Sequence, residues 1–284
     1  MLREIWRLLK GGVEAFIDDN ALSHGAAIAF YIITAFAPVL YIAAAIAGIV
    51  FGWEAATSAL RREIAYLVGP DGAQLVHAAL HNTLANRQGF WPNAIGAVLL
   101  IATASGVFGE MQTALNAIWK ATPRGFTVWE LVRTRLLSLG LVLALGFLLL
   151  ISLVMNAVVT ALGDRIEYVL PIGAAFAAAT NFAVSFVLVT ALFAAIYKVL
   201  PDVPLEWRDV IAGALGTATL FLAGEYLIAL YLGSGLVGYR YGAAGGLFVL
   251  LLWIYYTTQV FLLGAEFTKV YANRLGSQQD RDSA

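Results

Sequence analysis

The sequence predicts an all-α, polytopic membrane protein with six transmembrane helices. Of its 284 residues, 61% are hydrophobic and only 12% are charged, which is about half of the charged fraction that is usual in a soluble domain. The apolar residues form six long runs, and each run exceeds the roughly 20 residues that a helix needs to cross the hydrocarbon core. We expect helices because lipid offers unpaired backbone groups no hydrogen-bond partner.

The elements follow from these runs in chain order. The expected spans cover residues 27–51, 93–119, 136–162, 172–197, 210–232 and 243–267. Before the first span, apolar residues recur at helical spacing with charged residues between them, which predicts an amphipathic helix at 1–20 lying on the membrane surface. Two further apolar patterns separated by a turn predict an external helical hairpin at 52–92. Residues 1–274 are thus expected to form a single integral membrane domain, followed by a short disordered tail at 275–284.

The orientation follows from the basic residues. Most of the 17 Lys and Arg residues fall in the segments that lie on the same side as the N-terminus. Basic residues are enriched in cytoplasmic loops, so we expect both termini in the cytoplasm.

Two similar dipeptides suggest an internal repeat. Gly109-Glu110 lies in the second expected span and Gly224-Glu225 in the fifth. These positions are equivalent if the spans form two inverted halves of three, as in many transporters. Coincidence is the alternative, because the chain contains 27 glycines.

Composition excludes several classes of protein. The chain has no cysteine, which excludes disulfides and thiolate metal sites, and its net charge of −1 offers no basic field for nucleic acid. The sequence contains no phosphate-binding loop of the Walker type. His77 and His81 lie four residues apart, a spacing that can hold a metal, but the glutamate that a zinc protease places after the first histidine is absent, which favours a chance surface pair. The sequence therefore predicts no enzymatic activity, no catalytic residue, no cofactor, no metal and no nucleic-acid partner.

Three acidic residues inside the apolar runs are the main site candidates, Glu110, Glu225 and Glu266. An acid within a membrane span is costly, so it usually faces the bundle interior or a wet cavity. Each could form part of a substrate or proton site, or hydrogen-bond a neighbouring helix. For Glu266, Lys269 follows one turn later, and this spacing favours an ion pair at the membrane edge.

Three other residues complete the candidate set. Arg240 lies between two tyrosines at the start of the sixth span, where it could bind a lipid headgroup or anchor the helix at the interface. Pro38 interrupts the first span and removes one helical hydrogen bond, and Asn116 adds an amide to the second. Separately, Gly213 and Gly216 are expected to let the fifth and sixth spans pack closely.

Several short motifs occur in a characteristic order and spacing. They are AAIAFY at 26–31, TAFAP at 34–38, GVF at 106–108, LNAIW at 115–119, YKVLPD at 197–202, WRDV at 207–210, YGAAG at 241–245, LLWIY at 251–255 and LGAE at 263–266. Together they resemble the YihY/BrkB family of bacterial inner-membrane proteins over about residues 25–273. The resemblance implies a six-helix inner-membrane protein with cytoplasmic ends. Members of this family have been discussed as envelope or lipid transporters, and the family once carried the label ribonuclease BN, a name that belongs to an unrelated enzyme.

Two functions remain open at this point. Intramembrane acids and an interrupted first span favour a transporter or a lipid flippase or scramblase, whose partners would be membrane lipids and whose substrate would be a lipid or another amphipathic molecule. The alternative is a non-transporting scaffold or envelope-assembly partner, and self-association is open in either case. A ribonuclease is disfavoured, because the cytoplasmic loops are too short to build a metal cluster beside a basic groove.

Overall fold

All regular secondary structure that the computed structural model describes is helical. It describes residues 2–52, 54–58, 61–62, 106–121, 173–233 and 243–278. The defined helices are α1 (Leu2–Asp18), α2 (Ala21–Phe51), α6 (Gly173–Val199), α7 (Trp207–Gly233) and α9 (Ala243–Arg274). A further helical stretch covers residues 106–118. The predicted third span, Arg240 and most of the predicted hairpin lie outside the described residues.

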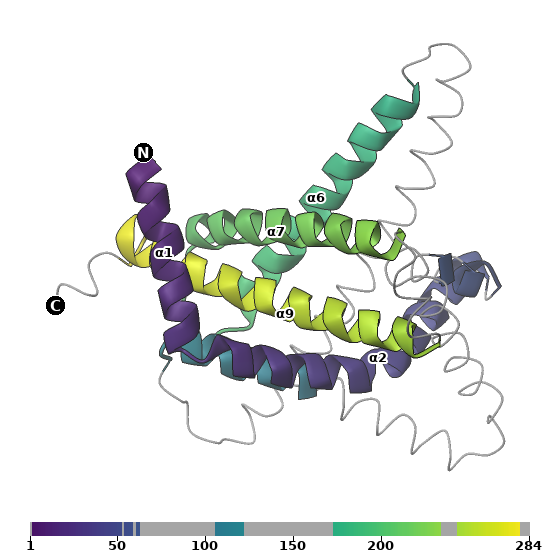
Figure 1. Cartoon of the computed structure of the whole chain (residues 1–284), viewed down its shortest axis with the longest axis horizontal. Helices are drawn as coiled ribbons and strands as arrows, with labels where there is room; N and C mark the ends of the chain where they lie inside the picture. The colour runs from purple at the N-terminus through teal and green to yellow at the C-terminus, as the bar shows by residue number, and fades with distance from the viewer. Residues whose placement is uncertain are drawn as a thin grey trace.

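The helices assemble around α9. In Figure 1, α7 and α2 flank α9, and α6 crosses behind α7. The contacts agree with this arrangement, since α9 packs against α7, α2 and α1, and α6 packs against α7. α1 runs across one end of the bundle, and α9 ends at that same end (Figure 1).

Within the part of the chain that the structure describes, three helices contain stretches that are long and apolar enough to cross a membrane. These are Ala178–Val199 in α6, Trp207–Ile228 in α7 and Leu250–Arg274 in α9, and α2 contains a shorter apolar stretch at Ala21–Ala35. The all-helical class predicted from sequence is confirmed. The count of six spans and the inverted repeat stay predictions, because the described residues do not test them.

A sharp turn joins α1 to α2. Only Asp19 and Asn20 separate the two helices, and Asn20 adopts a left-handed backbone conformation with φ of 53°. Asparagine tolerates this conformation better than most residues, so the chain can change direction within two residues. The turn sets α1 across the ends of the long helices.

α1 presents two different apolar faces. Gly11 and Gly12 lie close to Val270 and Phe267 of α9, where the absence of side chains on α1 permits close packing. A second face leaves large apolar side chains exposed, namely Trp6, Leu9, Val13 and Ile17. α1 occupies the place of the expected amphipathic helix, and its location at a membrane surface stays a prediction.

An aromatic stack fills the space between α6 and α9. The rings of Tyr197 and Phe261 stack with centroids 5.4 Å apart, and Phe193 stacks on both. The Tyr197 hydroxyl is buried, lies 3.0 Å from the Thr217 hydroxyl and donates a 2.6 Å hydrogen bond to the Phe261 carbonyl. The polar end of this buried tyrosine is therefore satisfied, as burial requires.

Two Gly-x-x-x-Thr sequences interlock between α7 and α9, an arrangement that we call the Gly–Thr lock. A methyl group added at Gly213 of α7 would lie 1.6 Å from the hydroxyl of Thr268, and one added at Gly264 of α9 would lie 1.8 Å from that of Thr217. Each threonine also donates to the glycine of its own helix, over 2.8 Å from Thr217 to Gly213 and 2.6 Å from Thr268 to Gly264. Each glycine thus receives the threonine of the opposite helix.

The expectation for the other glycine of α7 was wrong. Nothing lies within 4 Å of a methyl group built at Gly216, so Gly213 rather than Gly216 supports the close contact with α9. With 3.6 residues per turn, Gly216 lies about 60° around the helix axis from Gly213, so it lies beside the narrow line of contact with α9 rather than on it.

Candidate functional site

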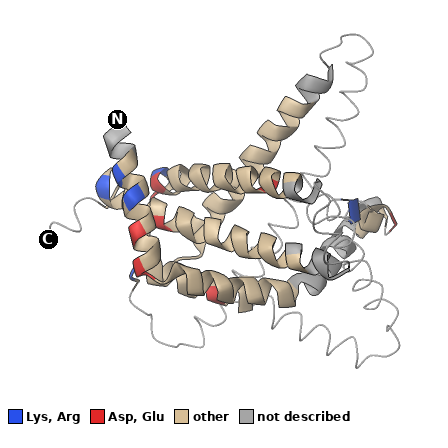
Figure 2. Ribbon diagram, viewed as in Figure 1, with Lys and Arg blue, Asp and Glu red and all other residues tan. Residues whose placement is uncertain are grey.

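Charged residues gather at the end of the bundle that α1 crosses (Figure 2). Lys269 of α9 lies at the centre of one group. Its Nζ donates a 2.9 Å hydrogen bond to Oδ2 of Asp19, in the turn between α1 and α2, and lies 3.5 Å from Oε2 of Glu266, one helical turn earlier on α9. We call these three residues the ionic triad.

Glu266 is the most deeply buried member of the ionic triad. Its side chain is 0% exposed, against 15% for Lys269 and 20% for Asp19. Neither of its carboxylate oxygens has a hydrogen-bond partner among the described residues. Removing an ionised carboxylate from water costs several kcal/mol, and a single ion contact offsets this only with good geometry and further hydrogen bonds. With all three groups charged, the triad carries one net negative charge, which one proton or cation would neutralise.

Asp19 has a different environment from Glu266. Its partial burial alone would raise the pKa of its carboxyl, but the hydrogen bond from Lys269 and the positive charge of that residue lower the pKa below its ordinary value of 3.8. Asp19 is therefore held in the ionised form. It shares the ammonium group of Lys269 with Glu266, and Lys120 adds a second positive charge that acts on Asp19.

A second acid pairs with a histidine. Oε1 of Glu110, on the helical stretch 106–118, lies 3.4 Å from Nδ1 of His24, which is in the first turn of α2. Both side chains are partly exposed, 24% for Glu110 and 29% for His24. The pair is therefore accessible from outside the bundle.

Asn116 joins its helix to the loop after α6. Its Nδ2 donates to Oδ2 of Asp202 over 2.8 Å, and its Oδ1 accepts from the backbone N–H of Asp202 over 2.9 Å. Gln112, one turn earlier, also donates to Oδ2 of Asp202, over 3.3 Å. This agrees with a role for Asn116 in joining segments, and a substrate role for it stays a prediction.

The remaining candidates lie apart from the ionic triad. Glu225 is on α7, where its neighbour Gly224 faces Tyr256 of α9. Tyr256 precedes Glu266 by ten residues, so Glu225 lies about 15 Å along the bundle from the triad. Pro38 lies within α2, which continues to Phe51.

Sequence reasoning singled out His24, with Asp19 just before it, as a proton entry point or a helix cap, but it did not identify the partners of either residue. Asp19 and His24 are separated by 250 and 86 residues from the groups that they meet, and local spacing carries no information at that range. The available signal was general: titratable residues at the ends of different spans on the same side of a membrane tend to meet.

The apolar helices and the acids held between them define an α-helical integral membrane protein. A family model described as "Virulence factor BrkB" matches residues 13–284. The chain therefore belongs to this family, as the sequence motifs predicted.

The chain is similar to several bacterial proteins that are named as membrane proteins. The chain is 32% identical over 183 residues to the "UPF0761 membrane protein YihY" of Escherichia coli O7:K1, a match that covers 62% of this chain and 58% of the relative. It is 29% identical over 180 residues to a UPF0761 membrane protein of Mannheimia succiniciproducens, covering 63% and 60%. A match to a UPF0761 membrane protein of Alcanivorax borkumensis extends over 262 residues at 26% identity, covering 90% and 58%. The chain thus spans less than two thirds of the length of these relatives, and no solved structure matches it.

Proposed function

We propose that this protein is a transporter of the bacterial inner membrane that moves a lipid or another amphipathic molecule across the bilayer. The observation that carries the proposal is the buried carboxyl group of Glu266. It lies on the helix around which the others assemble, and it is 0% exposed without a hydrogen-bond partner among the described residues.

Stability alone does not account for this carboxyl group. A buried charge that is incompletely paired is expensive, and intramembrane acids commonly mark ion, proton or substrate pathways. Lys269 balances only part of the negative charge, because it also bonds to Asp19. In the proposed mechanism, a proton or a cationic group of the substrate completes the balance at Glu266 and leaves again during the transport cycle.

The pair of His24 and Glu110 supports a path for protons. It is partly exposed, and His24 follows Asp19 of the ionic triad by only five positions. In this proposal the pair exchanges protons with the cytoplasm, where both termini would lie. The roles of Glu225, Arg240, Asn116 and Pro38 along the substrate path remain proposals of the same kind.

Transport is tested in liposomes that contain the purified protein and a fluorescently labelled phospholipid. The assay measures how fast the label crosses the bilayer, with and without a pH gradient. For Glu266→Gln, which keeps the size of the side chain but removes its charge, we expect translocation to fall about tenfold, equivalent to about 1.4 kcal/mol.

Glu14→Gln is the matched control. Glu14 is also a glutamate that pairs with a lysine on its own helix, but its side chain is 61% exposed. Translocation should remain at the wild-type rate in this variant. Glu110→Gln and Glu225→Gln test the other two acids in the same way. Equal rates in the wild type and in Glu266→Gln would contradict the role proposed for Glu266. If the protein moved no lipid at all, lipid transport itself would be contradicted.

Close packing favours a second candidate, a membrane scaffold. The Gly–Thr lock and the aromatic stack join α6, α7 and α9 into a dense unit, and a scaffold needs rigidity rather than a path. A folded protein that moves no lipid, yet retains a partner protein during purification from native membranes, would establish this alternative.

A further inference from the structure

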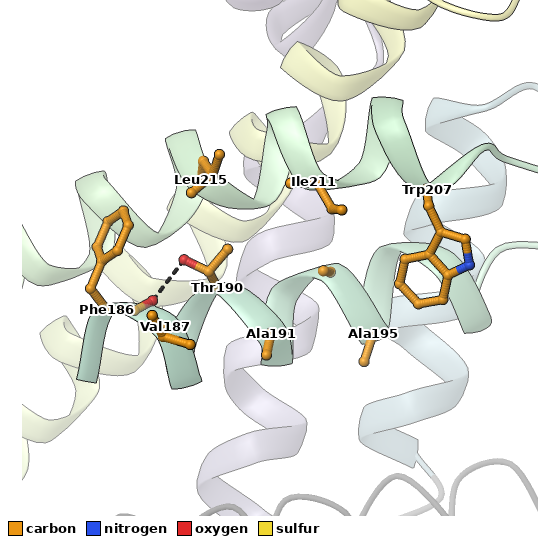
Figure 3. Close-up of a pocket in the computed structure, with 9 residues that line it drawn as sticks. Phe186, Val187, Thr190, Ala191, Ala195, Trp207, Ile211 and Leu215 are labelled. Carbon is orange, nitrogen blue, oxygen red and sulfur yellow. Dashed lines mark hydrogen bonds between the residues drawn. The ribbon is translucent and has the colours of Figure 1, made fainter. Parts of the chain in front are cut away.

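A groove runs along the outer side of α6 and α7 (Figure 3). Its volume is about 450 Å³, and every residue that lines it belongs to the apolar stretches 178–199 and 207–228. The lining residues are Phe186, Val187, Thr190, Ala191, Ala194, Ala195, Trp207, Ile211 and Leu215. If α6 and α7 span the bilayer, the groove faces the lipid.

Small side chains create the groove. Ala191 and Ala195 lie along its α6 side, while Phe186 and Trp207 lie toward its opposite ends (Figure 3). Large side chains on its rim remain exposed, with Val187 63% and Trp207 56% accessible. The groove is therefore open along its length and accessible to a long, narrow molecule from the side.

The interior of the groove selects an apolar occupant. Thr190 carries the one hydroxyl group among the lining residues, and this hydroxyl donates a 2.7 Å hydrogen bond to the Phe186 carbonyl of its own helix. A polar molecule would lose its water without gaining hydrogen bonds here. An alkyl chain loses no hydrogen bonds to water when it enters the groove, and it makes dispersion contacts along the wall.

One mouth of the groove carries a positive charge. Lys198 follows Ala191 by seven residues and Val187 by eleven, so it continues the row of α6 residues that lines the groove. Its ammonium lies 5.6 Å from the centroid of the Trp207 ring and donates to the carbonyl of Leu205. An ammonium has three donors, so it retains capacity for an anionic group. Lysine and tryptophan are both common where a span meets the headgroup layer.

We infer that this groove is a phospholipid-binding site, with an acyl chain along α6 and α7 and the phosphate beside Lys198. The apolar wall and the cationic mouth match the two parts of one phospholipid, whereas a free phosphate would leave the wall empty. A helix from a second copy would fill the wall but leave Lys198 without an anion. The inference goes beyond transport, because a lipid can bind here whether or not the protein moves it.

The test uses nanodiscs of phosphatidylethanolamine that contain the full-length protein and a small fraction of phosphatidylglycerol with a photoreactive diazirine in one acyl chain. After illumination, mass spectrometry of peptides locates the labelled residues. We expect labelling within residues 186–195 and 207–215. Replacing both Ala191 and Ala195 by leucine fills the groove, and labelling there should fall at least about fivefold because several methylene groups lose their contacts.

Ala178→Leu is the matched control. Ala178 is exposed on α6 but precedes Val187 by nine residues, which places it on the opposite side of the helix. Its labelling pattern should equal that of the wild type. Lys198→Gln tests the mouth: labelling by the phospholipid should fall about fivefold, while labelling by a diazirine diacylglycerol, which lacks the phosphate, should not change.

Two results would overturn the inference. One is equal labelling of the groove in the wild type and in the filled double variant. The other is cross-linking of α6 to a second copy of the chain in place of lipid, which would make the groove a self-association surface. Because labelling measures binding without translocation, a protein that binds lipid but fails the transport assay satisfies this inference and refutes only the proposed function.

Discussion

The ionic triad shows how far local sequence information reaches. Glu266 and Lys269 were expected to meet because residues three apart share one face of a helix, and their charged atoms lie 3.5 Å apart. The contact from Lys269 to Asp19 links positions 250 residues apart. This contact changes the chemistry, because it divides one positive charge between two carboxylates and leaves Glu266 incompletely balanced.

Asp19→Asn tests this division of charge through its pH dependence. The pKa of Asp19 is lowered, so its ionised form contributes stability above the ordinary value of 3.8, and that contribution disappears as the pH falls through the lowered pKa. Thermal unfolding in detergent should show Asp19→Asn less stable than the wild type at pH 6–7, by about 1.5 kcal/mol. The difference should shrink toward zero only below pH 3.8.

Asp18 offers the control at the neighbouring position. It is exposed, and Asp18→Asn should unfold at the wild-type temperature throughout the pH range. A deficit in Asp19→Asn that persists unchanged at acid pH would mean that the carboxylate charge is not what stabilises the turn.

At the scale of elements, helices α7 and α9 are joined by their smallest residues. Sequence placed two glycines of α7 in the contact because small residues favour helix packing in membranes, but it could not show which of them faces α9. That choice depends on the rotation of the helix about its axis, which the neighbouring helices set. The structure selects Gly213 and adds Gly264 as its counterpart on α9.

The same substitution at three glycines tests the Gly–Thr lock. Gly213→Ala and Gly264→Ala each place a methyl group within 2 Å of a buried threonine hydroxyl, so each should destabilise the protein by about 1–3 kcal/mol. Gly216→Ala meets nothing within 4 Å and should be neutral or stabilising by up to about 1 kcal/mol. Denaturation in mild detergent measures all three, and equal effects at the three positions would contradict the interlocking.

On the scale of the whole molecule, α1, the last turns of α9 and most of the described charges lie at the same end of the bundle (Figures 1 and 2). The class of fold was predictable because a long run of apolar residues in lipid forms a helix, which satisfies its own backbone hydrogen bonds. The groove was not, since Ala191 and Ala195 are ordinary residues in a membrane span and form a hollow only where the larger side chains of α7 lie opposite. The number of spans and the repeat of two halves stay predictions.

Reporter fusions test the orientation of the molecule. Alkaline phosphatase is active only outside the cytoplasm, so a fusion after Gly233, at the end of α7, should be active. Fusions after Asp202, between α6 and α7, and after the C-terminal Ala284 should be inactive, because basic residues favour the cytoplasmic side. Green fluorescent protein at the same points should give the reverse pattern. Activity at Ala284 would invert the assignment and place the ionic triad on the external side.

The Gly–Thr lock also restricts how the molecule can move. If α9 slid along α7 by one turn, about 5.4 Å, either the two threonines would collide or the two glycines would face each other across a void. Positions of α9 displaced along α7 are therefore unfavourable. We expect α7 and α9 to move together as one unit. The contact between α9 and α2 is close but one-sided. A methyl group added at Gly25 of α2 would lie 2.2 Å from the side-chain amide of Gln259, and single hydrogen bonds run from Thr258 to Gly25 and from Gln259 to Leu22, of 3.0 and 3.4 Å. Because no reciprocal pair interlocks these two helices, a movement within this bundle would separate α2 from the α7–α9 pair rather than divide that pair.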